Sequence, residues 1–247
     1  MAEASRPRIE RETSPPVAGP RTQETEAGMQ SGLLRQIVRA MADRIVANAE
    51  ELTTLDQAIG DGDHGLNMKR GFEAVRAEFA ATAEHDDAAF LLGVGRTLVM
   101  KVGGASGPLY GSFFMQMGKG WSAVNDRVSL IACLRQAVEA VASRGKSHPG
   151  QKTMLDVLFP LVEALPAALA EREPRFASLR ELAAEMAQAT VPMQAERGRA
   201  SFLRERSIGH MDPGAASSSM MVAAACEVLE EAFAVTPSGT HQETNGA

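Results

Sequence analysis

Eight stretches of this sequence carry apolar residues at the three- and four-residue spacing of an amphipathic helix, and short loops separate them. In the first stretch, Leu34, Val38, Met41 and Ile45 fall on one stripe. Aromatic residues make up only 4% of the chain, so helices packed through aliphatic side chains are favoured over a β-sandwich. We therefore expect an all-α protein. The predicted helices span residues 32–50, 66–80, 86–102, 107–120, 128–143, 153–169, 178–193 and 215–233.

The two ends of the chain differ in composition from the middle. Residues 1–28 contain four prolines among Arg, Glu, Ser and Thr and almost no large apolar side chains, which predicts a disordered leader. Residues 29–235 hold all the periodic segments and are expected to form one helical domain, since a hydrophobic content of 45% is enough to build a core. Residues 236–247 are polar and are expected to form a flexible tail.

Charge and cysteine content limit the classes of protein. The net charge of −6 gives no basic surface for a phosphate backbone, so nucleic acid is not expected as a ligand. No apolar run is long enough to span a bilayer, and the N-terminus lacks the apolar core of a signal peptide. Cys133 and Cys226 both lie in apolar helical segments, which indicates buried thiols in a reducing compartment. We expect a cytoplasmic protein without a membrane partner.

The loop at residues 55–67 gathers three carboxylates, a histidine and three glycines in the sequence LDQAIGDGDHGLN. Asp61 and Asp63 stand two residues apart among the glycines, which allow the backbone to direct both carboxylates at one point. Carboxylates without a nearby cysteine suit a hard cation such as Mg²⁺, which often completes its shell with substrate phosphates. The loop therefore indicates a nucleotide site.

This loop has two other interpretations. An EF-hand starting at Asp61 needs a bidentate Glu at its twelfth position, which is Phe72, and one starting at Asp56 has Ala58 and Asn67 at its third and twelfth positions. An EF-hand is therefore excluded. A plain Asp/Gly turn that caps the next helix stays open, because turns and N-caps use the same residue types for structural reasons.

Three further loops hold much of the glycine and many of the polar side chains. They span residues 103–108, 145–153 and 199–214. In an up-and-down antiparallel array alternate loops share one end, so these loops and the acidic loop are expected to converge on a ligand. Ser106 is expected to cap the helix that follows it.

Each of these loops also has a structural interpretation. The glycines of residues 103–108 could contact a phosphate or a base, or could let two helices pack closely. The arginines of residues 199–214 could cover an anion with bidentate donors, or could belong to a solvated surface loop. His148 is expected to be solvated.

Together these motifs resemble those of the L subunit of dihydroxyacetone kinase, the DhaL domain family. The resemblance lies in LDQAIGDGDHGLN at 55–67, GGASG at 103–107, SRGKSHPGQKTMLD at 143–156 and MQAERGRASFLRERSIGHMDPG at 193–214. With the helices between them it covers residues of about 32 to 233, and the leader is extra to the usual subunit.

The resemblance implies an antiparallel eight-helix barrel with ADP or ATP held at one end through two Mg²⁺ ions. By motif position, the metal ligands would be Asp56, Asp61 and Asp63. The residues against the nucleotide would be His64, Gly65, Leu66, Asn67, Ala105, Ser106, Gly145, Met154, Arg199, Asp212, Pro213 and Gly214.

The function implied by the resemblance is that of the ADP-binding subunit of a phosphoenolpyruvate-dependent dihydroxyacetone kinase. A phosphorylated M subunit would recharge the bound ADP, and a separate K subunit would hold the ketose through a histidine. The 247 residues leave no room for the substrate domain of a fused kinase. Dihydroxyacetone and a longer ketose such as a tetrulose both fit, since the carbonyl-binding histidine would lie on the K subunit. A nucleotide-dependent module that docks a regulator or lipid-carrying partner is the alternative.

Phosphoryl transfer asks the protein mainly for positioning and charge neutralisation, so no side chain is expected to act as a catalytic base. His64 could instead carry the phosphate as a covalent intermediate. A positioning role is preferred, because a bound nucleotide already supplies the phosphate.

Overall fold

The computed structural model describes residues 23–82, 85–170 and 174–234, which form helices and no strands, and this confirms the all-α prediction. The α-helices are α1 (Gln23–Ala47), α2 (Ala49–Ile59), α3 (His64–Glu78), α4 (Asp87–Lys101), α5 (Ser106–Gly120), α6 (Arg127–Gly145), α7 (Leu155–Ala168), α8 (Phe176–Ala189) and α9 (Pro213–Ala234). Two 3-10 helices, η1 (Trp121–Ala123) and η2 (Arg199–Ser207), complete the described elements.

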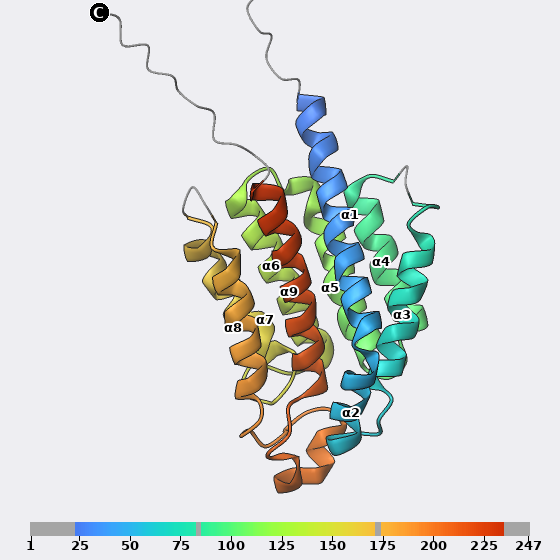
Figure 1. The fold of residues 1–247 in the computed structure, drawn as a ribbon, viewed down its shortest axis with the longest axis vertical. Coiled ribbons are helices and arrows are strands. Elements are labelled where there is room, and N and C mark those ends of the chain that lie inside the picture. The colour runs from blue at the N-terminus through green and yellow to red at the C-terminus, as the bar shows by residue number, and fades with distance from the viewer. Residues whose placement is uncertain (1–22, 83–84, 171–173, 235–247) are drawn as a thin grey trace, which may run out of the picture.

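The long helices form a closed ring. α1 packs against α3, each later helix packs against the next in chain order, and α9 packs back against α1. Successive long helices run in opposite directions, as Figure 1 shows. The short helix α2 and the 3-10 helix η2 contact each other and lie together at one end of the ring. The ring is the eight-helix barrel that the resemblance implied.

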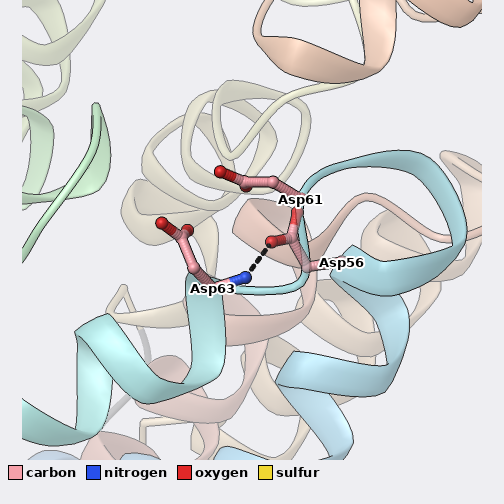
Figure 2. Close-up of side chains that lie close together, drawn as sticks. All are labelled: Asp56, Asp61 and Asp63. Carbon is pink, nitrogen blue, oxygen red and sulfur yellow. Dashed lines mark hydrogen bonds between the residues drawn. The ribbon is translucent and has the colours of Figure 1, made fainter.

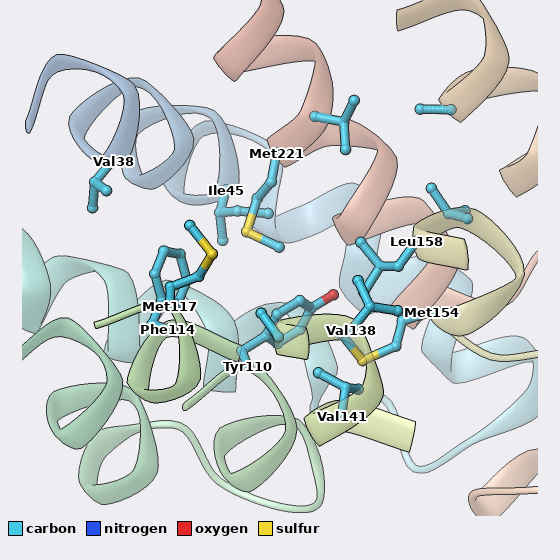
Figure 3. Packing of buried hydrophobic residues seen from close by; sticks show 14 of the residues in the cluster. Val38, Ile45, Tyr110, Phe114, Met117, Val138, Val141, Met154, Leu158 and Met221 are labelled. Carbon is cyan, nitrogen blue, oxygen red and sulfur yellow. The ribbon is translucent and has the colours of Figure 1, made fainter. Parts of the chain in front are cut away.

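The interior of the barrel is filled by side chains. Met221 of α9, Ile45 of α1 and Met117 of α5 meet between their helices (Figure 3). Phe72 of α3 and Phe90 of α4 are fully buried in the same cluster. The apolar stripe of each helix faces this core, because burying that stripe stabilises the folded chain far more than helix propensity does.

Helices α4 and α5 pack closely through glycine. A Cβ atom at Gly107 would lie 2.4 Å from the carbonyl oxygen of Val102, and one at Gly111 would lie 2.8 Å from that of Gly95. Neither helix could approach so closely with a side chain at these positions. Of the two interpretations given for the glycines of residues 103–108, Gly107 therefore has the structural one, which is close packing of two helices.

The structure differs from the predicted boundaries near the N-terminus. Helix α1 begins at Gln23, so residues 23–28, expected in the leader, are helical, while residues 1–22 lie outside the described part. The predicted helix 32–50 is divided at Asn48, whose side-chain amide donates to the Arg44 carbonyl oxygen.

The polar tail predicted for residues 236–247 also lies outside the described residues. Within the described ranges, no helix combines the length and apolar character needed to cross a membrane.

Candidate functional site

A cavity of about 410 Å³ opens at the end of the barrel that holds α2 and η2. The loops that precede α3, α5, α7 and α9 all contribute to its lining, as the up-and-down topology predicts. The volume is in the range of small-molecule sites. The predicted site residues that line it are Asp56, Asp61, Asp63, His64, Asn67, Ala105, Ser106, Gly145, Met154, Arg199, Asp212, Pro213 and Gly214.

Gly65 and Leu66 are the predicted site residues that do not line this cavity. A Cβ atom at Gly65 would lie 1.9 Å from the carbonyl oxygen of Ala49 and 2.4 Å from Thr53 Oγ1, so this glycine allows α3 to start directly against α2. The side chain of Leu66 is directed outward and the residue is 62% exposed. The packing of α3 against α1, α2 and α4 buries His64 and Gly65 and leaves Leu66 outside the cavity.

The three aspartates lie close together where α2 connects to α3. Asp56 is buried in the last turn of α2, whereas Asp61 and Asp63 lie in the connection to α3. Each offers a carboxylate oxygen, and these atoms all lie within 4.8 Å of one another (Figure 2). Gathering three negative charges is costly unless a cation offsets them, and three carboxylate oxygens form a donor set that suits Mg²⁺.

Asp56 also has a structural task. Its Oδ2 accepts the backbone N–H groups of Asp63 at 2.9 Å and of His64 at 3.1 Å, which otherwise lack helical partners at the start of α3. Asp63 occupies the N-cap position, but its own side chain makes no capping hydrogen bond. The plain-turn interpretation therefore accounts for Asp56 and not for the carboxylates of Asp61 and Asp63.

An arginine of η2 also reaches the acidic cluster. Arg199, the first residue of η2, places its guanidinium Nη1 2.6 Å from Asp61 Oδ2. Arg144 and Arg197 line the same cavity. The site thus combines carboxylates for a cation with guanidinium groups for an anion, as a metal-bound phosphate requires.

His64 is held by two hydroxyl groups. Its Nδ1 lies 3.1 Å from Ser106 Oγ and its Nε2 lies 3.0 Å from Ser217 Oγ. Burial lowers the pKa of His64, and this exceeds the opposite effect of the Asp56 and Asp63 charges. Ser106 was expected to cap α5, but Ala105 is at the N-cap position and the Ser106 hydroxyl contacts His64 instead.

The start of α9 forms another wall. Asp212 accepts the Ala215 N–H at 2.7 Å, and Pro213 is the first helical residue, so the Asp-Pro sequence supplies an N-cap and a preset first turn. Burial raises the pKa of Asp212 to about 7, with a smaller contribution in the same direction from the Asp156 charge. Asp156 itself accepts the N–H groups of Gly150 and Thr153, which fixes the loop before α7.

Several residues of the site were missed by sequence reasoning. Arg144, Ser147, Lys152 and Arg197 contribute to the lining, and the side chain of Lys152 is fully buried. Lysine in a polar loop gives no signal of burial, because the same residue is normally solvated. His148, expected to be solvated, is exposed.

Comparison with known proteins identifies the family. The DAK2 domain family matches residues 58–227. The chain belongs to the DAK2 domain family. This confirms the resemblance to the L subunit of dihydroxyacetone kinase that the motifs indicated.

Relatives in this family include subunits that this chain matches over most of their length. The chain is 44% identical over 185 residues to the ADP-binding subunit DhaL of the PEP-dependent dihydroxyacetone kinase of Escherichia coli. This match covers 73% of this chain and 88% of that subunit. It is also 44% identical over 180 residues to a subunit of the same name from Listeria innocua, covering 72% and 87%. D-erythrulose kinase of Mycolicibacterium smegmatis is 36% identical over 193 residues, covering 75% of this chain and 33% of that enzyme.

A solved structure shares the fold. The dihydroxyacetone kinase from C. freundii, crystallised with AMP-PNP and Mg²⁺, superimposes with a TM-score of 0.63 at 20% identity. The match covers 92% of this chain and 38% of that one. The chain therefore corresponds in fold to a part of that larger enzyme.

Proposed function

We propose that this chain is the ADP-binding subunit of a phosphoenolpyruvate-dependent kinase that phosphorylates dihydroxyacetone or a related small ketose. The observation that carries the proposal is its 44% identity to subunits of that name over nearly their whole length. The convergence of Asp61, Asp63 and Arg199 on one cavity supports it, because these residues supply the charges that a metal-bound nucleotide needs.

In this proposal Asp56, Asp61 and Asp63 hold two Mg²⁺ ions, which neutralise phosphate charge when bound. Arg199 would lie against the phosphates from the η2 side, and its contact with Asp61 supports this role. The first turns of α3 and α9 border the same cavity, and the positive end of each helix dipole favours an anion there.

The other predicted residues that line the cavity, including Asn67, Ala105, Ser106, Gly145, Met154 and Pro213, would enclose the nucleotide.

The chain would relay phosphate without a covalent protein intermediate. A phosphorylated M subunit would convert bound ADP to ATP, and a K subunit would present the ketose for transfer, all in the cytoplasm. Both ring nitrogens of His64 are already within hydrogen-bonding distance of hydroxyl groups, which favours a positioning role for this residue over phosphorylation.

The test is a reconstituted transfer assay. The purified chain with ADP and Mg²⁺ is mixed with a K subunit, a phosphorylated M subunit carrying labelled phosphate, and either dihydroxyacetone or D-erythrulose. We expect labelled ketose phosphate in an amount that exceeds the amount of this chain, and none with the Asp63→Asn variant. Label that stays on the nucleotide while both partners are active would overturn the proposal and leave a nucleotide-dependent binding module as the function.

A further inference from the structure

The side chain of Lys152 lies fully buried beside the candidate site, with 0% exposure. Its ammonium nitrogen lies within hydrogen-bonding distance of the backbone carbonyl oxygens of Thr190 (2.9 Å), Met193 (3.0 Å), Ser207 (2.8 Å) and His210 (2.6 Å). An ammonium group has three N–H donors, so these carbonyls together satisfy it. Hydrogen bonds made by a charged donor are stronger than those between neutral groups.

The four carbonyl groups lie at the two ends of one segment. Thr190 and Met193 precede η2, and Ser207 and His210 follow it. One buried cation therefore joins the beginning and the end of residues 190–210, which carry Arg199 into the cavity. The ends also meet directly, because the Gly209 N–H donates to the Val191 carbonyl oxygen at 2.8 Å.

The segment has little regular structure of its own. η2 is a short 3-10 helix with a kink at Arg204, where φ is 52° and ψ is −125°. The hydrogen bonds of a 3-10 helix have poorer geometry than those of an α-helix, so the position of this segment depends on contacts with the rest of the molecule. Within the segment, the Ser207 hydroxyl accepts the Ala195 N–H at 2.9 Å and so joins its two halves.

The backbone at Lys152 is itself held in an unusual conformation. Its φ is 59°, in the left-handed region that is uncommon for a residue with a side chain. Asp156 accepts N–H groups from Gly150 and Thr153, on either side of Lys152, and so keeps the loop in this shape. Surroundings that enforce a costly conformation suggest that the direction of the side chain matters.

We propose that Lys152 is a positioning residue that fixes the segment 190–210 and thereby holds Arg199 against the nucleotide. We call the hydrogen bonds from the Lys152 ammonium to the two ends of segment 190–210 the tether. The role of Arg199 in this inference rests on the proposed function, but the tether itself does not. Lys152 acts through Arg199, since its own ammonium is engaged by the carbonyl groups of the segment.

The first test is hydrogen exchange on the full chain without ligand. Lys152→Met removes the ammonium but keeps an unbranched side chain, and Lys146→Met is the matched control. Lys146 lies in the same loop, also has a positive φ of 48°, and is exposed. We expect faster exchange across residues 190–210 in Lys152→Met alone, with residues 222–228 of α9 unchanged. Exchange of residues 190–210 that equals the wild-type rate would overturn the proposal.

Lys152→Gln is the milder variant if Lys152→Met does not fold. Its amide keeps two N–H donors without the charge, so residues 190–210 should exchange faster than in the wild type but the fold should persist. Wild-type exchange in Lys152→Gln would equally contradict the tether.

The second test is a double-mutant cycle on ADP affinity in the presence of Mg²⁺. We expect Lys152→Met, or Lys152→Gln in its place, to weaken ADP binding by about tenfold in the wild-type background and by much less when Arg199 is already Ala. Equal losses in both backgrounds would show that Lys152 does not act through Arg199. A wild-type chain that binds no ADP would refute the proposed function instead, while the exchange result would still decide whether the tether exists.

Discussion

The three aspartates of the acidic loop have unequal roles although they share one motif. Asp56 is buried and accepts two backbone N–H groups, so it fixes the loop as well as offering an oxygen to the cavity. Asp61 contacts Arg199, and the side chain of Asp63 does not cap its own helix. Spacing predicted that these carboxylates meet, but the division of tasks depends on α2, whose existence the sequence did not reveal.

At the residue scale, Asp61→Asn and Asp63→Asn are each expected to abolish retention of ADP with Mg²⁺. A neutral amide cannot offset a divalent ion held against phosphate oxygens. The fold should persist, because the exposed pair of Asp61 with Arg199 contributes little to stability. Native mass spectrometry measures the bound ADP, and wild-type stoichiometry in both variants would remove the metal assignment.

Asp212 predicts a pH dependence of stability. Its pKa is about 7 in the folded chain against 3.8 for an aspartate free in water, so the folded state binds the proton more tightly. The stability that this contributes is complete below about pH 4 and is lost as the pH rises through 7. Asp212→Asn keeps an oxygen for the N-cap and cannot ionise, so it should stabilise the protein relative to wild type above pH 7.

The size of this difference is bounded at about 4 kcal/mol by the shift in pKa, and the partial exposure of Asp212 to the cavity makes it smaller. The measurement is urea unfolding of both proteins without ligand from pH 4 to 8. His64, whose pKa is lowered, gives the opposite slope but is common to both proteins and cancels in the difference. A difference that does not change with pH would show that Asp212 does not hold a proton.

At the scale of the elements, helices with a long apolar stripe could be predicted and those set by tertiary contacts could not. α3 was predicted at 66–80 and lies at His64–Glu78. It could be predicted because its apolar residues recur at helical spacing on the face that it buries. α2 was missed because the predicted helix ended at residue 50 and the acidic loop was taken to begin at residue 55, whereas residues 49–59 are helical. η2 has no apolar pattern from which it could be predicted. Its shape depends on Lys152, which lies in the loop before α7, and on Ser207, the last residue of η2.

The junction of α2 and α3 predicts the effect of Gly65→Ala. A Cβ atom there would meet the Ala49 carbonyl oxygen at 1.9 Å, so α3 must move away from α2 and carry the acidic loop with it. We expect destabilisation of about 1–3 kcal/mol, together with weaker ADP binding. Chemical denaturation and calorimetry measure the two effects.

Gly93→Ala is the matched control for this change. Gly93 is also within a helix, α4, but a Cβ atom there has no heavy atom within 4 Å. Alanine should stabilise that helix by up to about 1 kcal/mol. If both variants change stability alike, the close approach at Gly65 is not the cause.

At the scale of the whole molecule, the apolar core and the candidate site occupy different parts of the barrel. The core lies inside the ring, where Met117, Val138 and Met221 fill the space, and the cavity opens at the end built from four loops. The sequence predicted which loops converge, since alternate connections of an antiparallel array share one end. It could not predict that Leu66 faces outward, because the rotation of α3 is fixed by packing against α1, α2 and α4.

This separation predicts how a ligand changes stability. ADP and Mg²⁺ that join loops at one end of the barrel bind only the folded state, so at about 100 times the dissociation constant they contribute roughly 2.7 kcal/mol. For a domain of this size the melting temperature should rise by about 5–10 °C. Removing the metal with EDTA should have the opposite effect, since Asp56, Asp61 and Asp63 then repel one another without a cation.

The loops should loosen before the helices melt, because in the proposed complex the ligand joins the loops and the core lies apart from them. Hydrogen exchange with and without EDTA compares residues 60–67 and 199–214 with the interior of α9 at residues 222–228. We expect both loops to lose protection on chelation while the interior of α9 keeps it. Equal protection of the two loops in the apo and loaded forms would mean that they do not share a nucleotide site, and the assignment of Arg199 to the phosphates would then be wrong.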